Sequence, residues 1–252
     1  MSYRFAVEQQ DYSDFASGRV FCGAPGYPAF PVRLASEIFQ RCLAHREANH
    51  QPAAAWRLYD PCCGGAYHLC TLAYLHWPAI AELIGSDVDA QALSLAERNF
   101  SLLTLEGLQR RRAEIARLFT AYGKASHRAA LETADTLQRK VRQLLTMHPV
   151  KTRVFCADAT DPIAVCRHLG GVKVDLVITD LPYGRQVHWQ AGASAPCPSP
   201  VWLMLNALCD VLSSASLVAI AADKQQKIAH EHYRRIEHFR LGKRQVAILK
   251  LG

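Results

Sequence analysis

The chain has 252 residues, half of them hydrophobic, which is enough for one α/β domain with a substantial core. Lys and Arg outnumber Asp and Glu by 29 to 22, and the net charge of +7 favours a polyanionic partner. No run of about 18 apolar residues and no basic-then-apolar leader occurs, which argues against membrane-spanning and secreted proteins and predicts a cytoplasmic protein with no membrane partner.

The first predicted strand, residues 56–60, runs into a turn of small residues and then into a helical pattern. Glycine has no Cβ, so a turn of this kind lets a ligand approach the backbone at the carboxyl edge of a sheet. The turn therefore predicts a nucleotide-type cofactor site. Its candidate residues are Asp60, Cys62, Gly64 and Gly65.

Cysteines gather in the same region, but they do not indicate a metal. The chain has nine cysteines, an odd number, and no Cys-x-x-Cys pair, so reduced thiols are expected. The spacing of Cys62, Cys63, His68 and Cys70 matches no zinc pattern. We therefore expect no metal site.

Two further predicted strands end in acidic residues. Strand 82–87 ends at Asp87, with Asp89 close behind it, and an acid at such a strand end can accept hydrogen bonds from both hydroxyls of a ribose. Asp87 is the first choice for this role and Asp89 the second. Strand 152–157 is followed by Asp158, a candidate contact for an adenine amino group. Each of these acids could instead cap the helix that follows it.

A long connection separates those two strands, and apolar residues at three-to-four spacing predict two helices within it, over about residues 106–148. From Ser101 to Arg153 the chain carries eleven basic and four acidic residues, which accounts for the whole positive surplus. A basic helical hairpin suits contact with RNA phosphates, although a charged face on ordinary packing helices is the alternative. The residues predicted to contact RNA are Arg110, Arg111, Arg112 and Arg117.

Strand 174–180 runs directly into Asp180-Leu181-Pro182-Tyr183. An exocyclic base amine is a poor nucleophile because its lone pair is delocalised into the ring, so two acceptors must draw on its hydrogens. Asp180 and the Leu181 carbonyl are the candidate acceptors, Pro182 would fix the turn, and Tyr183 offers a ring for stacking. The alternative is an ordinary turn that ends a buried strand.

The remaining predicted strands are 217–222, 233–240 and 244–250. The last two surround Leu241-Gly242-Lys243, so they should form an antiparallel hairpin. Strands alternating with helices predict a Rossmann-like α/β fold: a mostly parallel, seven-stranded sheet with a reversed strand at its C-terminal end. This is the arrangement of class I methyltransferases.

Three segments carry a closer resemblance to a known family. They are Pro25–Ala35, Asp60-Pro61-Cys62-Cys63-Gly64, and Thr179–Gly184 with His188-Trp189 after it. Over nearly its whole length the chain resembles the avilamycin-resistance rRNA methyltransferases. That resemblance implies methylation of guanine N2 in 23S rRNA, or in the large ribosomal subunit, by S-adenosylmethionine, and protection from an orthosomycin antibiotic.

The resemblance also implies a domain layout and further site residues. Residues 1–50 would form an arm and helix over the cofactor site, with Phe30 and Arg33 lining it, and residues 51–252 the core of a monomer. His188 or Trp189 would cover the second face of the target base. The chain departs from the family at Ala66, where the pattern Asp-x-x-x-Gly-x-Gly has its second glycine, and this puts cofactor affinity in question.

Other functions fit parts of the same pattern. Pro196-Cys197-Pro198 superficially matches the turn of cytosine carbon methyltransferases, but Cys197 lies too far beyond strand 174–180 to set the geometry of attack. A non-catalytic RNA-binding protein with a degenerate fold would account for Ala66 and the basic hairpin. A DNA base or a protein glutamine could also present the planar amine.

Overall fold

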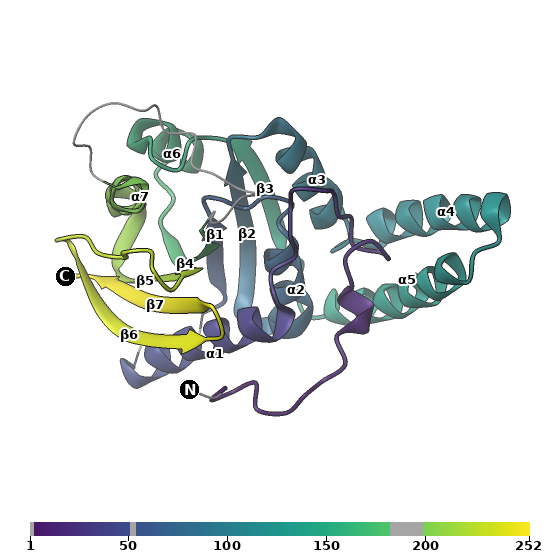
Figure 1. The fold of residues 1–252 in the computed structure, drawn as a ribbon, viewed down its shortest axis with the longest axis horizontal. Coiled ribbons are helices and arrows are strands. Elements are labelled where there is room, and N and C mark those ends of the chain that lie inside the picture. The colour runs from purple at the N-terminus through teal and green to yellow at the C-terminus, as the bar shows by residue number, and fades with distance from the viewer. Residues whose placement is uncertain (1–2, 51–53, 182–198) are drawn as a thin grey trace.

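The computed structural model describes residues 3–50, 54–181 and 199–252. Its centre is one seven-stranded sheet with the order β3-β2-β1-β4-β5-β7-β6, in which β7 alone runs opposite to the other six strands (Figure 1). The strands are β1 (Trp56–Asp60), β2 (Ile80–Asp87), β3 (Lys151–Cys156), β4 (Val174–Asp180), β5 (Leu212–Asp223), β6 (Tyr233–Leu241) and β7 (Arg244–Leu251). The predicted class I methyltransferase fold is confirmed.

Two strands begin at least two residues before their predicted starts. β2 begins at Ile80 rather than at residue 82, and β5 begins at Leu212 rather than at residue 217. The start of β5 contains serines and therefore lacks an apolar signal. Ser216 is nevertheless buried, because its hydroxyl donates to the Val174 carbonyl at 2.6 Å.

Helices cover both faces of the sheet. Alternate side chains of β5 point to opposite faces, so Ala219 and Ala221 join one core cluster while Val218 and Ile220 join the other. The first cluster packs under α1 (Val32–Ala48), α2 (Tyr67–His76) and α3 (Ala90–Ser101), and the second under α6 (Pro162–Leu169) and α7 (Pro200–Leu208). Three short 3₁₀ helices cover Ser13–Phe15, Trp77–Ala79 and Cys209–Val211.

The predicted helical insertion is a hairpin of α4 (Leu105–Tyr122) and α5 (Ala125–Leu144), and Figure 1 shows it extending away from the sheet. Thr104 caps α4 by accepting a hydrogen bond from the Gly107 amide, and Gly123 ends it at φ +62°. Ile115 is buried as its spacing predicts. Tyr122 continues the same three-to-four spacing but is 65% exposed, because it lies at the tip of the hairpin, beyond the core.

Residues 3–31 run along the surface formed by α2 and the hairpin before α1 begins. Phe15 and Phe21 insert into the core and contact the ring of Tyr74. The amides of residues 4–6 all donate to the carboxylate of Glu37 in α1. This N-terminal segment is thus held at its start and at its middle before it reaches the carboxyl edge of the sheet.

Candidate active site

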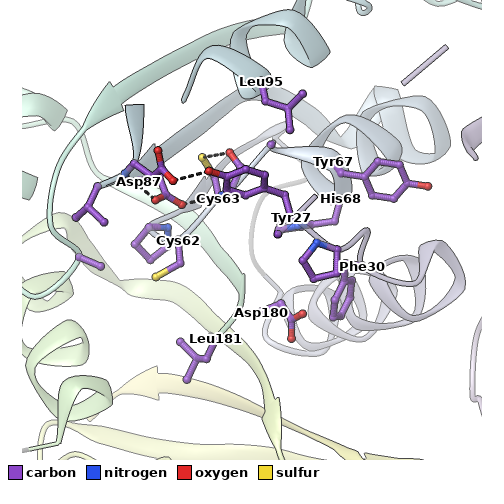
Figure 2. Close-up of a pocket in the computed structure, with 18 of the residues that line it drawn as sticks. Tyr27, Phe30, Cys62, Cys63, Tyr67, His68, Asp87, Leu95, Asp180 and Leu181 are labelled. Atoms are coloured by element: carbon purple, nitrogen blue, oxygen red, sulfur yellow. Dashed lines mark hydrogen bonds between the residues drawn. The ribbon is translucent and has the colours of Figure 1, made fainter. Parts of the chain in front are cut away.

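A cavity of about 820 Å³ opens at the carboxyl ends of the parallel strands, between the sheet and the N-terminal segment. This volume lies within the range of small-molecule sites, and its position is the one at which α/β sheets bind ligands. Figure 2 shows Asp87, Tyr27 and Cys63 toward one end of the cavity and Asp180 and Phe30 toward the other. The cavity therefore connects the predicted cofactor turn with the predicted catalytic turn.

The turn after β1 has the geometry that its glycines predict. Gly64 lies at φ +50°, in the left-handed region, and lines the cavity. A Cβ on Gly65 would lie 2.7 Å from a methyl carbon of Leu95, so only glycine lets α3 pack this closely. Cys62 lines the cavity as well.

Asp60 lies beneath this turn and not in the lining of the cavity, which corrects its predicted role as a cofactor contact. Its side chain is fully buried, and Oδ1 accepts a hydrogen bond from the Cys62 amide at 3.0 Å. Burial raises the pKa of Asp60 to about 7. The interactions of the Asp60 carboxylate are with the turn and with the neighbouring His68, so it holds the turn from beneath.

Ala66 adopts the left-handed conformation, φ +52°, at the N-terminus of α2, and its methyl group is fully buried. Left-handed backbone costs an alanine about 1–2 kcal/mol, whereas burial of one methyl group gains about 0.8 kcal/mol. The departure from the glycine pattern is therefore accommodated by the core.

We expect Ala66→Gly to change the free energy of unfolding by less than about 1 kcal/mol, because the relief of backbone strain is offset by the lost methyl group and a more flexible unfolded chain. Affinity for S-adenosylhomocysteine should stay within about twofold of the parent, since Ala66 does not line the cavity. Urea unfolding and calorimetry measure the two quantities. A much tighter complex in the variant would mean that Ala66 does weaken cofactor binding.

The acids at the strand ends differ in the donors that already bind their carboxylate oxygens. Asp87 lines the cavity and accepts hydrogen bonds from the amides of Gly64 at 2.9 Å and Asp89 at 3.1 Å. Asp89 caps α3 through the Gln91 amide at 2.8 Å, and its other oxygen accepts from the hydroxyl of Tyr27. That hydrogen bond raises the pKa of Tyr27 to about 12. Asp89 lines the cavity too, so both acids remain proposed ribose contacts.

Asp158 also lines the cavity, and its Oδ1 accepts from both the amide and the hydroxyl of Thr160. Phe30 lies in the lining too, edge-on to the ring of His68. Arg33 does not, which corrects its prediction: its guanidinium donates to the carbonyls of Ala6 and Val7 and lies over the ring of Tyr3. Arg33 is the second residue of α1, and its side chain reaches the start of the N-terminal segment.

Asp180 ends β4 at the far end of the cavity from Asp87. Among the described residues, nothing donates a hydrogen bond to its buried Oδ1, and its Oδ2 lies 3.7 Å from Nη2 of Arg244. Burial raises the pKa of Asp180 to about 6, with Arg244 and His68 opposing the shift and Asp60 adding to it. A buried acceptor without a donor is a candidate for binding a ligand.

Leu181 follows in the lining, with its amide donating to the Ala221 carbonyl at 2.9 Å. The other residues predicted for this turn, Pro182, Tyr183, His188 and Trp189, lie outside the described residues, and so does Cys197.

Of the lining residues that the sequence did not predict as site residues, three bear directly on the chemistry: Tyr27, His68 and Arg244. His68 was considered only as a metal ligand, yet its Nε2 lies 3.2 Å from Oδ2 of Asp60 and 3.3 Å from the Ile178 carbonyl. Burial lowers the pKa of His68. Its place on the inner face of α2, directly after the turn, was the available signal. Arg244 stands at the start of a strand, and nothing in its immediate sequence marks it.

Among the described residues, one group of three metal-ligand side chains has its atoms within 4.8 Å of one another: Cys209, His230 and His232. These residues lie outside the lining of the cavity. No helix of the described residues is long and apolar enough to cross a membrane.

The four arginines predicted to contact RNA lie on α4, but they are not equivalent. Arg111 holds the N-terminal segment, because its guanidinium donates to the carbonyls of Arg19 and Val20. Because the Arg111 guanidinium is already bound to the N-terminal segment, its prediction as a free RNA contact is corrected. Arg110 pairs with Glu106, and Arg112 joins the two helices through Asp135. Arg117 is exposed.

Comparisons with known proteins agree with this geometry. Residues 1–244 match the family described as rRNA methyltransferase AviRa. A 23S rRNA (guanine(2535)-N(1))-methyltransferase from Streptomyces viridochromogenes is 39% identical over 251 residues, 99% of this chain and 96% of the relative. Two solved structures of the rRNA methyltransferase aviRa from the same organism superpose with TM-scores of 0.85 and 0.84. Each solved structure is 37% identical to this chain, and the match covers 99% of this chain and 96% of the solved chain.

The name of that relative corrects one expectation from the sequence. It assigns the methyl group to N1 of guanine, whereas the resemblance was taken to imply the exocyclic N2. The N2 assignment is therefore wrong. N1 is a ring nitrogen that carries a proton, so the chemical demand on Asp180 is different.

Proposed function

This chain belongs to the AviRa family of rRNA methyltransferases, and we propose that it methylates N1 of a guanine in 23S rRNA with S-adenosylmethionine as donor. The observation that carries the proposal is the pairing of a nucleotide-type pocket with the buried Oδ1 of Asp180, which accepts a hydrogen bond from no donor within residues 3–50, 54–181 and 199–252. On the resemblance found in the sequence, we expect the modified ribosome to resist an orthosomycin antibiotic.

The residues of the cavity fit the proposed cofactor. The Asp87 carboxylate suits the ribose, Asp158 suits the adenine amino group, and the turn at Gly64 and Gly65 lets an aminoacyl chain approach the backbone. When bound, S-adenosylmethionine supplies a methyl group on a positively charged sulfur, and that sulfur is the leaving group. The walls of the cavity at Phe30 and Leu181 exclude water around the reacting nitrogen.

Asp180 is proposed as the general base. Neutral guanine has a hydrogen on N1, so the N1–H bond must break and leave its electron pair for the new N–C bond. Oδ1 of Asp180 is positioned to take that proton, and the raised pKa of Asp180, about 6, makes it a stronger base than an ordinary carboxylate. Leu181, which follows it in the lining, offers a carbonyl for the neighbouring N2 amine.

The test is incubation of the protein with labelled S-adenosylmethionine and unmodified 23S rRNA, followed by nucleoside mass spectrometry. The proposal predicts 1-methylguanosine. Formation of 2-methylguanosine, or methylation of DNA or of a protein glutamine instead, would contradict it. Calorimetry with S-adenosylhomocysteine excludes a non-catalytic RNA-binding protein if it gives measurable heat.

We further propose that the α4–α5 hairpin binds rRNA phosphates. Arg117 and Arg128 are both exposed on it, and the Arg128 guanidinium lies 5.5 Å from the ring of Phe119. Neither residue touches the cavity, so substitution should affect RNA binding without affecting the cofactor.

The double variant Arg117→Glu with Arg128→Glu should weaken rRNA binding and reduce the slope of log affinity against log salt by about two. Filter binding across a salt series measures this slope. The matched control is Arg234→Glu with Arg240→Glu, which makes the same charge change on exposed residues of β6. An equal loss in both variants would mean that only net charge matters.

A further inference from the structure

Arg244 lies at the reacting end of the cavity without any role in the proposed mechanism. It is the first residue of β7, and the pairing of Asp223 with Arg244 fixes its backbone beside β5. Asp180 is fixed in the same sheet by its pairing with Ala221. The two side chains therefore come from strands that flank β5, and both line the cavity.

We propose that Arg244 binds O6 of the target guanine while Asp180 accepts the N1 proton, so that the pair selects guanine and Arg244 stabilises the charge that forms on O6. The inference rests on the proposed N1 methylation. It assigns to Arg244 a catalytic role in contact with the reacting base.

The hydrogen-bonding edge of guanine fits this pair. On that edge a donor, N1–H, stands next to an acceptor, O6. Asp180 presents an acceptor, and Arg244 presents donors 3.7 Å away from it. Adenine has the reverse order, an acceptor at N1 beside a donor at N6, so it would meet both side chains with the wrong polarity.

The same geometry suits the charge of the reaction. When N1 loses its proton to Asp180, the electron pair spreads through C6 onto O6. O6 then carries negative charge and no proton. The Arg244 side chain is 27% exposed and its guanidinium lies 5.5 Å from the ring of Phe30, so it acts in a partly desolvated place. A fixed cation there stabilises the oxyanion more than it would in water.

A simpler role for Arg244 is to keep Asp180 ionised. In the part of the chain that the structure describes, the charged and titratable groups that face Asp180 are Arg244 from β7, His68 from α2 and Asp60 from β1. Loss of Arg244 would raise the pKa of Asp180 under either role. Only direct contact with O6 would also lower the rate at a pH where Asp180 is fully ionised in both proteins.

The experiment measures single-turnover methylation of 23S rRNA from pH 5.5 to 9 by the parent, Arg244→Gln and Arg244→Lys. Arg240→Gln, on the exposed face of β6, is the matched control. We expect the plateau rate of Arg244→Gln to fall about 10²- to 10³-fold, the usual effect of removing an oxyanion donor. Arg244→Lys should recover part of the loss because it keeps the charge without the fork of donors.

A second arm replaces the target guanosine by 6-thioguanosine. Sulfur is a weak acceptor, so the loss caused by Arg244→Gln should shrink on this substrate if the guanidinium binds at position 6. An equal loss on both substrates, or a plateau rate equal to that of the parent, would overturn the inference. Retained binding of S-adenosylhomocysteine and an unchanged unfolding midpoint show that the variants are folded. If the parent itself forms no 1-methylguanosine, it is the proposed function that has failed.

Discussion

Asp180→Asn should lower the rate of methyl transfer by about 10²- to 10⁴-fold, the range for loss of a general base. The amide has nearly the shape of the carboxylate and can still contact Arg244, but it cannot take the N1 proton. Affinity for S-adenosylhomocysteine should stay near that of the parent, because Asp180 lies at the opposite end of the cavity from Asp87. Single-turnover kinetics with nucleoside mass spectrometry give the rate, and Asp210→Asn, an exposed residue outside the cavity, is the control.

The pH dependence adds a second expected result. The pKa of Asp180 is raised to about 6, so the rate for the parent should fall about tenfold per pH unit below that value as the carboxyl takes up its proton. Ionisation of Asp180 changes the stability of the fold in the opposite direction from the rate of methyl transfer. A folded-state pKa above the unfolded value means that ionisation of Asp180 destabilises the fold, so the parent loses stability as the pH rises toward 6.

Asp180→Asn lacks this penalty. It should therefore unfold with a free energy no lower than that of the parent at pH 7.5, and the difference should disappear below about pH 4. Loss of activity with retained stability would separate catalysis from folding. An Asn variant that methylates as fast as the parent would remove Asp180 from the mechanism.

The succession of strands along the chain, the mostly parallel sheet and the ends of β1 and β4 followed from the sequence because each strand carries its own apolar run and ends in polar residues. Gly64, Asp87 and Asp180 followed for the same reason: the carboxyl ends of parallel strands meet at one edge, so local motifs at those ends assemble into one site. These predictions needed no knowledge of contacts between distant residues.

The wrong predictions concern residues whose partners are distant in the sequence. Arg33 and Arg111 are cations whose partners are backbone carbonyls of the N-terminal segment, far from them in sequence, and no local pattern reveals such a contact. Arg244 reaches Asp180 only because β7 is reversed beside β5. The predicted position of methylation was wrong because Asp-Leu-Pro-Tyr indicates only which acceptors are present. N1 and N2 of guanine are neighbours, and both offer hydrogens to an acceptor.

The N-terminal segment illustrates how a remote contact supports the site. Glu37 in α1 is fully buried, and its two oxygens accept from the amides of Arg4, Phe5 and Ala6 at 2.7–2.8 Å and from Arg41 at 2.7 Å. The chain that begins at these amides continues to Tyr27 and Phe30, which form the wall of the cavity. Glu37 therefore secures the start of the segment that closes over the proposed cofactor.

Glu37→Ala should lower the free energy of unfolding by about 1–3 kcal/mol, because it leaves the buried amide of Ala6 and the partly buried amides of Arg4 and Phe5 without an acceptor, while Arg41 keeps its ion pair with Glu237. Urea unfolding followed by circular dichroism measures this. Glu47→Ala, an exposed glutamate on the same helix, is the control and should change stability by less than about 0.5 kcal/mol. A small effect of Glu37→Ala would mean that residues 4–6 are not held in this way.

The pH dependence of the Glu37 effect has a definite sign. Burial alone would raise the pKa of its carboxyl, but the hydrogen bonds from the backbone amides and from Arg41 outweigh it, and the net shift is downward. A lowered folded-state pKa gives stability that is fully present above the unfolded value, near 4.3, and is lost as the pH falls through the folded-state value. The difference between parent and Glu37→Ala should thus be constant near pH 7 and shrink below about pH 4.

Because Tyr27 and Phe30 depend on the same segment, affinity for S-adenosylhomocysteine should also fall in Glu37→Ala but not in Glu47→Ala. A stability loss that leaves this affinity unchanged would show that the wall of the cavity forms without its distant attachment.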